Sequence, residues 1–305
     1  MKKIILVILF SIFQFVGYTQ NKRYTSLSEA MKVSDKVKWF DPNCEEFESF
    51  PFEIKKLSNL ESLYLTNCKI NEIPNVITEF SKLTLLNLKY NNINYLPSEF
   101  NQLDKLSVLN LRGNKFRVLP EVLVEMSNLR ELDLSENPAL HFIQASSVLS
   151  EIKNLDFLYL SGNNLKEIPV SLSDLNKLQE LHLKNNPELD LKQAFDILSQ
   201  IKSLKILALS DNDFKMIPEN LSSLKNLEGL MLDNNPNLSI QKLVSNLKSL
   251  PNLKVLLLRD NNWEYLPNNL DGFFDLKVLE LSNNNFREKE QQRIQTQLPN
   301  TKVIF

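Results

Sequence analysis

The chain has 305 residues, of which 43% are hydrophobic, so it can bury a large core in one elongated array or in two globular domains. Its 35 lysines and arginines nearly balance its 37 aspartates and glutamates, and a net charge of −2 argues against a nucleic-acid partner, because phosphate binding needs clustered surplus cations. Five glycines and two histidines leave little material for phosphate loops or histidine metal sites, so we expect no cofactor and no metal.

The first residues, MKKIILVILFSIFQFVGYTQ, have the layout of a secretory signal peptide. Two lysines precede an almost unbroken apolar run over residues 4–16, and the small-residue pattern of a cleavage site fits best before Gln20. Residues 1–19 are therefore the predicted signal peptide. We expect export to the periplasm, the cell surface or the medium, with no membrane span after cleavage. An uncleaved segment would instead anchor the chain in a membrane.

Residues 20–59 are predicted to form an amino-terminal cap and a degenerate first repeat. The stretch SLSEAM resembles a helix capping box, with Ser26 three residues ahead of Glu29, and predicts a short helix over residues 27–34. Beyond this helix, apolar residues keep the spacing of the later repeats, but a proline and a glutamate interrupt the strand core.

The two cysteines, Cys44 and Cys68, are too few for a disulfide framework. One bridge between them is possible in an oxidising compartment. In the register of the repeats, Cys44 falls on the outward side of its turn and Cys68 on the inward side, which makes a bridge geometrically awkward. The sequence leaves the bridge open.

Residues 60–286 contain ten copies of one unit. Each copy begins with the pattern leucine-x-x-leucine-x-leucine, and all thirty of these positions are leucine. Eight residues after each start stands an asparagine, or Cys68 in the first copy. The ten starts are Leu60, Leu83, Leu106, Leu129, Leu155, Leu178, Leu204, Leu227, Leu253 and Leu276.

The spacing within one unit predicts a short strand with one buried face. The second and third leucines are two residues apart, so both point to one side of a strand. Stacking the units in parallel, ~4.8 Å apart, joins these leucines into a continuous core. The asparagine carries a donor and an acceptor, so it can pair backbone groups that turn inside the core. Leaving such a group unpaired costs roughly 1–3 kcal/mol, so we interpret the asparagines as structural.

Successive starts lie 23 or 26 residues apart, and from Leu106 onward short and long units alternate. Short units end in leucine-proline or isoleucine-proline, which favours an extended or tightly turned outer wall. Long units carry asparagine-proline followed by helical patterns such as DLKQAFDILSQI and SIQKLVSNLKSL, with Asp190 and Ser239 as expected N-caps. Residues 287–305 are predicted to close the array with a helix and a final strand.

These motifs resemble the leucine-rich repeat family in its 23-residue LPxxLxxLxxL style, which occurs in plant intracellular Ras-group-related and many bacterial repeat proteins. PSEFNQL at residues 97–103 and PVSLSDL at residues 169–175 carry that style. The resemblance implies an α/β horseshoe-shaped solenoid, with a concave parallel sheet that binds proteins and sometimes peptides or glycans. On its convex side we expect irregular and short helical segments to alternate.

The residues that flank the second leucine of each unit should point away from the core, where a partner would meet them. They form two columns, and neighbours along a column are in contact range because adjacent strands lie ~4.8 Å apart. A contiguous exposed apolar patch commonly marks an interaction site. The predicted partner-binding residues are Tyr64, Phe157, Tyr159, His182, Ile206, Met231, Val255, Leu257 and Val278.

The sequence gives little support for a catalytic site or a metal site. His182 and Asp133 could form a base with an orienting acid, but no serine or cysteine stands ready as a nucleophile. Asp211 and Asp213 suggest calcium, yet the following residues lack the glycine and ligands of a calcium loop. Trp263 takes an inward position and is interpreted as core. We therefore predict a chain that is not an enzyme.

The sequence predicts a non-catalytic module, exported to the cell envelope or outside, that binds a protein partner through its sheet. One alternative is a structural or adhesive envelope protein that binds a glycan or a host surface. Another is an intracellular signalling scaffold with an atypical apolar start. The identity of the partner and the oligomeric state do not follow from the sequence.

Overall fold

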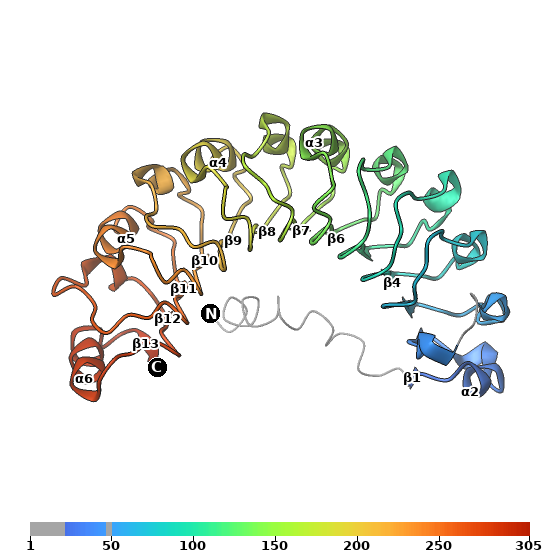
Figure 1. Ribbon diagram of the computed structural model, residues 1–305, viewed down its shortest axis with the longest axis horizontal. Coiled ribbons are helices and arrows are strands. Elements are labelled where there is room, and N and C mark those ends of the chain that lie inside the picture. The colour runs from blue at the N-terminus through green and yellow to red at the C-terminus, as the bar shows by residue number, and fades with distance from the viewer. Residues whose placement is uncertain (1–21, 47–50) are drawn as a thin grey trace. The chain divides into compact units, whose positions relative to one another are not determined.

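The computed structural model describes residues 22–46 and 51–305, so the predicted signal peptide lies outside the described residues. The chain divides into two compact units, an amino-terminal unit that ends at Asn163 and a carboxy-terminal unit from Asn164 to Phe305. Each unit is built as a coil of repeats, with its strands on one side of the coil and its helices and turns on the other (Figure 1).

Among its described residues the amino-terminal unit contains seven strands, and neighbours in sequence pair in parallel. The strand β1, which the sequence analysis did not predict, precedes the helix α2 (Leu27–Met31) and pairs with β2 of the degenerate repeat. The strands are β1 (Arg23–Tyr24), β2 (Trp39–Phe40), β3 (Ser62–Tyr64), β4 (Leu85–Asn87), β5 (Val108–Asn110), β6 (Glu131–Asp133) and β7 (Phe157–Tyr159).

The carboxy-terminal unit contains six strands that also pair in parallel and in sequence order. From β8 to β12 the middle leucines face each other across the strands, as Leu207, Leu230 and Leu256 do, and in the last pair Leu279 faces Val303. The strands are β8 (Glu180–His182), β9 (Ile206–Ala208), β10 (Gly229–Met231), β11 (Val255–Leu257), β12 (Val278–Glu280) and β13 (Lys302–Ile304). The parallel sheet confirms the predicted fold class.

Helices follow the alternation of unit lengths. The three long units carry the α-helices α3 (Phe142–Glu151), α4 (Leu191–Leu198) and α5 (Ile240–Leu247), and α6 (Glu288–Gln297) precedes the last strand. The sequence analysis expected irregular segments at this position in the short units. The structure forms single 3₁₀ turns there instead. Proline at the N-cap position, as at Pro97 and Pro169, fixes φ near −60° and starts all of these turns but the last, whose N-cap is Leu270. The turns are Asn75–Glu79, Ser98–Gln102, Glu121–Glu125, Val170–Asp174, Glu219–Ser223 and Asp271–Phe273.

The predicted helix caps are confirmed in one case of three. The carboxylate of Asp190 accepts hydrogen bonds from the backbone N–H groups of Lys192 and Gln193, at 2.9 and 3.1 Å. The side chain of Ser239 makes no capping bond to α5. Ser26 makes none to α2 (Leu27–Met31), and its hydroxyl lies 2.9 Å from that of Ser28 instead. The helix α2 also ends at Met31, earlier than the predicted residue 34, and a 3₁₀ turn, Ser34–Lys36, follows it.

The asparagine positions form the predicted hydrogen-bonded ladder. The Asn91 Oδ1 atom accepts from the backbone N–H groups of Cys68 and Ile70, at 2.9 and 3.0 Å. Its Nδ2 atom donates to the carbonyls of Leu65 and Leu88, at 2.7 and 2.8 Å. One side chain thus pairs backbone groups of two successive repeats, which is why both a donor and an acceptor are needed at this position.

A disulfide joins Cys44 to Cys68, with Cα atoms 5.0 Å apart. The sequence left this bridge open, and the structure forms it because the degenerate repeat turns at residues 44–46 and brings the two Cα atoms within bridging distance. Cys68 occupies the position that asparagine holds in the later repeats. At the amino-terminal end of the ladder a covalent bond therefore links two successive units.

Removing this bridge should lower the stability of the amino-terminal unit. The paired change Cys44→Ser and Cys68→Ser releases a loop closed over a sequence separation of 24 residues. By loop-closure entropy this should lower the free energy of unfolding by about 2–4 kcal/mol. Urea titration of the oxidised protein and the double variant measures the change. Equal stability of the two proteins would show that the bridge does not restrain the cap.

No helix among the described residues is long and apolar enough to cross a membrane.

Candidate functional site

The candidate site is the face of the sheet that carries the first and third residues of each strand, which we call the outer sheet face. The middle residue of each strand from β3 to β12 is leucine and points into the core, as Leu230 and Leu256 do with almost no exposure. Because side chains alternate along a strand, the residues on either side of these leucines share the opposite face. We describe this face separately for each unit.

In the carboxy-terminal unit the outer sheet face carries a contiguous group of apolar side chains, which we call the apolar cluster. Parallel pairing sets Ile206, Gly229, Val255 and Val278 in one row and Ala208, Met231 and Leu257 in the next. The cluster consists of Ile206, Ala208, Met231, Val255 and Val278, with Leu257 and Ile304 partly buried against it.

The predicted residues are thus brought together, but they are less exposed than the sequence indicated. Val255 is 3% exposed and Met231 7%, whereas Leu257 keeps intermediate exposure. Adjacent strands are in register, so each side chain has apolar neighbours beside it along its own row. The sequence analysis placed these residues on the correct face and underestimated how far neighbouring rows cover one another.

Two polar residues of β8 adjoin the apolar cluster. Glu180 pairs in register with Ile206, and His182 with Ala208. The Nε2 atom of His182 lies 2.5 Å from Oε1 of Glu180, and the Glu180 side chain is 1% exposed. The second carboxylate oxygen of Glu180, Oε2, is buried and has no hydrogen-bond partner. The sequence analysis singled out His182 and missed Glu180, although both residues flank the second leucine of the same repeat.

Ion pairs border the outer sheet face where the strands end. Lys184 pairs with Asp211 at 3.1 Å, and Arg259 with Asp233 at 2.7 Å. The hydrogen bond from Arg259 to Asp233 outweighs the opposing effect of desolvation and raises the pKa of the guanidinium, with further attraction from Glu280 and Asp260. The charged side chains at this border of the outer sheet face are therefore neutralised by one another.

The outer sheet face of the amino-terminal unit is more polar. Asn87, Asn110 and Asp133 form a column in register, and the Asn110 amide donates to the Asp133 carboxylate at 3.1 Å. Tyr64 stands at one end of this column, where its ring centroid lies 5.8 Å from that of Trp39. The other two predicted residues of this unit, Phe157 and Tyr159, lie on β7 with intermediate exposure.

One aromatic group beside this column was not predicted. Tyr90 is 41% exposed, and the charged groups of Lys89 and Arg112 lie 5.9 and 5.8 Å from its ring centroid. Burial opposes ionisation of Arg112, but its hydrogen bond to Glu136 and the nearby negative charges together outweigh burial and raise the pKa of the guanidinium. Gly113, at φ +64°, permits this arrangement, because a Cβ there would lie 2.3 Å from the Tyr90 ring. The sequence did contain a signal for this contact, because a glycine follows the tyrosine after one repeat length of 23 residues.

Comparison with known proteins agrees with this architecture. A family model described as a leucine-rich repeat region matches residues 43–198, more than half of the chain. The chain belongs to the leucine-rich repeat family. The resemblance stated from the motifs is thereby confirmed, and with it the assignment of the asparagines to the repeat framework.

Two solved structures illustrate the likeness. An internalin from Listeria monocytogenes is 23% identical, with 83% of this chain and 75% of that chain covered and a TM-score of 0.55. A leucine-rich repeat protein from Leptospira interrogans is 22% identical, with 93% and 100% covered and a TM-score of 0.37. At these identities the likeness concerns the fold alone. No curated protein matches the chain.

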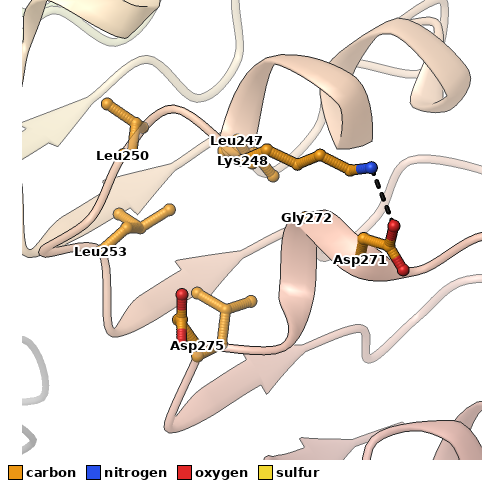
Figure 2. Close-up of a pocket in the computed structure, with 8 residues that line it drawn as sticks. Leu247, Lys248, Leu250, Leu253, Asp271, Gly272 and Asp275 are labelled. Carbon is orange, nitrogen blue, oxygen red and sulfur yellow. Dashed lines mark hydrogen bonds and ion pairs between the residues drawn. The ribbon is translucent and has the colours of Figure 1, made fainter.

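A cavity on the leucine-rich repeat framework lies between α5 and the turn Asp271–Phe273 (Figure 2). Lys248 and Asp271 form an ion pair of 2.9 Å across its edge, and leucines line its floor. Its volume of about 150 Å³ is below the ~300–1,000 Å³ of typical ligand pockets. Gly272 lies so close to the backbone of α5 that a Cβ at this position would be 2.1 Å from the Val244 carbonyl oxygen. We interpret this cavity as a packing gap.

The side chains considered for catalysis and calcium have other partners. His182 is paired with Glu180, and Asp133 of the other unit accepts from Asn110 and from the Ser135 backbone N–H. Asp211 accepts from the Asn234 amide at 2.9 Å. Within the part of the chain that the structure describes, no group of three or more histidine, cysteine, aspartate or glutamate residues is placed to hold a metal.

Proposed function

We propose that this leucine-rich repeat chain is a non-catalytic binding module that recognises a protein partner through its outer sheet face. The observation that carries the proposal is the contrast between the two faces of one sheet. The inward positions are leucine in every complete repeat, whereas the outward positions change from repeat to repeat. A constant inward row builds the framework, and a varied outward row provides a surface that can be specific for one partner.

The predicted partner-binding residues of the carboxy-terminal unit are the strongest part of this proposal. Ile206, Met231, Val255 and Val278 form one apolar cluster bordered by ion pairs, the arrangement of an apolar centre with a polar rim that protein interfaces share. Leu257, which packs against the apolar cluster, keeps intermediate exposure, so a partner side chain can contact it. Tyr64, Phe157 and Tyr159 form the corresponding predicted contacts in the amino-terminal unit.

The proposal includes export. The basic and apolar start of the sequence is typical of a signal peptide, and the disulfide Cys44–Cys68 supports an oxidising compartment, because disulfides are rare in the reducing cytosol. Amino-terminal sequencing of the protein from cell-envelope and culture fractions tests it. A mature chain that begins at or near Gln20 supports export with cleavage, whereas a chain that retains Met1 contradicts cleavage.

The experiment that tests partner recognition is a cross-linking pull-down from envelope fractions with the wild type and Leu257→Asp. A charge at the accessible edge of the apolar cluster should reduce recovery of the captured protein at least tenfold, because the carboxylate would lose water against an apolar partner. The matched control is Val170→Asp, since Val170 is 65% exposed on a 3₁₀ turn away from the sheet. Equal recovery with both variants would contradict binding through this face.

A second candidate function, adhesion to a glycan, has one observation in its favour. The outer sheet face of the amino-terminal unit combines amides and a carboxylate with Tyr64, and aromatic rings beside polar groups suit sugars. Binding that is lost in Tyr64→Ala and Tyr159→Ala but kept in Leu257→Asp would favour this function. The reverse result would favour protein recognition.

A further inference from the structure

We propose that the partner of the carboxy-terminal unit is a polypeptide segment that places a lysine or arginine side chain on Glu180 and apolar side chains on the apolar cluster. This inference rests on the proposed protein-binding function and specifies the chemistry of the partner. It is carried by one buried carboxylate oxygen and by the apolar surface beside it.

The carboxylate of Glu180 is buried, although only one of its two oxygens has a hydrogen-bond partner. Its side chain is 1% exposed, its Oε1 atom is paired with His182, and its Oε2 atom has no hydrogen-bond partner. A buried polar atom without a partner destabilises a protein, and more so when it carries charge. A ligand that donates a hydrogen bond to Oε2 would remove this penalty on binding.

Among the described residues no donor reaches Oε2 of Glu180, so a bound ligand would have to supply one. Two lysines near Glu180, one four residues further along the chain and one next to its register partner Ile206, are each paired with another carboxylate. Lys184 pairs with Asp211 and Lys205 with Glu228, both at 3.1 Å. Within the described residues, His182 is the single partner of the Glu180 carboxylate. A cationic donor is favoured over a neutral one, because hydrogen bonds to charged groups are shorter and stronger.

The surroundings of Glu180 determine what kind of molecule brings this cation. Its register partner Ile206 begins the apolar cluster, which continues across β10 and β11 to Val278 on β12. Three strand spacings of ~4.8 Å give this surface a length of about 14 Å. Aliphatic side chains line it, whereas sugar recognition favours aromatic and polar groups. A peptide segment with a basic residue next to aliphatic residues matches both parts.

A peptide-display selection with a random 16-residue library on the full chain tests the inference. Selected peptides should share a lysine or arginine adjacent to aliphatic residues. One such peptide is then synthesised with its lysine or arginine and, for comparison, with norleucine in that place. Glu180→Gln keeps the size of the side chain and removes the charge, so it should weaken the basic peptide at least tenfold and its norleucine analogue less than threefold.

Glu264→Gln is the matched control, because Glu264 is exposed and lies away from the outer sheet face; it should bind both peptides as the wild type does. The inference is overturned if no peptide is enriched, if the enriched peptides lack a basic residue, or if Glu180→Gln affects both peptides equally. Peptides without a basic residue that still lose binding in Leu257→Asp would refute the role of Glu180 and leave the proposed function standing. Loss of glycan binding in Glu180→Gln, with no peptide enriched, would assign the site to a sugar instead.

Discussion

Leu256→Asp is expected to prevent the carboxy-terminal unit from folding, whereas Leu257→Asp, one residue further on, is expected to leave it folded. Leu256 is the middle residue of β11 and is fully buried, while Leu257 lies on the outer sheet face with intermediate exposure. Shortening a buried leucine to alanine already costs about 2–5 kcal/mol, and an unpaired buried carboxylate adds several kcal/mol more. Domains are stable by only about 5–15 kcal/mol, so little stability would remain.

Circular dichroism during thermal unfolding, together with the soluble yield, measures this difference. Leu257→Asp should unfold within a few degrees of the wild type and lose partner binding. Leu256→Asp should show no cooperative transition for this unit. Because the two residues are neighbours in one strand and undergo the same substitution, only the direction of the side chain distinguishes them. If both variants fold, or both fail, the assignment of inward and outward residues is wrong.

The framework could be predicted from the sequence because one physical requirement recurs in every repeat. Each inward leucine contacts the leucines of the repeats before and after it, so the requirement repeats with the period of the chain and is visible without coordinates. The same reasoning predicted the hydrogen bonds of Asn91. These features depend on residues at a fixed separation along the sequence.

Features that depend on the conformation of a single segment were not predicted. The bridge between Cys44 and Cys68 depends on how the degenerate repeat turns, and two serines expected to cap helices do not bond to them. The low exposure of Val255 depends on how closely neighbouring rows pack. The unpaired oxygen of Glu180 depends on the rotamer that its bond to His182 selects. A periodic pattern carries no information about any of these.

Asn212→Ala is expected to lower the free energy of unfolding of the carboxy-terminal unit by about 3–5 kcal/mol, because it leaves more than one buried backbone group unpaired at about 1–3 kcal/mol each. The Asn212 Oδ1 atom accepts from the buried backbone N–H of Asn186. Its Nδ2 atom donates to the carbonyls of Leu183 and Leu209, at 3.2 and 2.9 Å. The methyl group of alanine can replace none of these bonds.

The exposed Asn268 provides the matched control, and Asn268→Ala should change the stability by less than about 0.5 kcal/mol. Urea titration gives the free energies, and hydrogen exchange at the Asn186 amide locates the damage, since this N–H loses its acceptor and should exchange faster than in the control. A loss below about 1 kcal/mol would mean that water takes the place of the amide. Water could then satisfy the backbone groups that the asparagine ladder pairs. The presence of asparagine in every complete repeat after the first would need a different physical cause. A loss of the expected size would instead show that each repeat depends on the side chain of the next for its own buried hydrogen bonds.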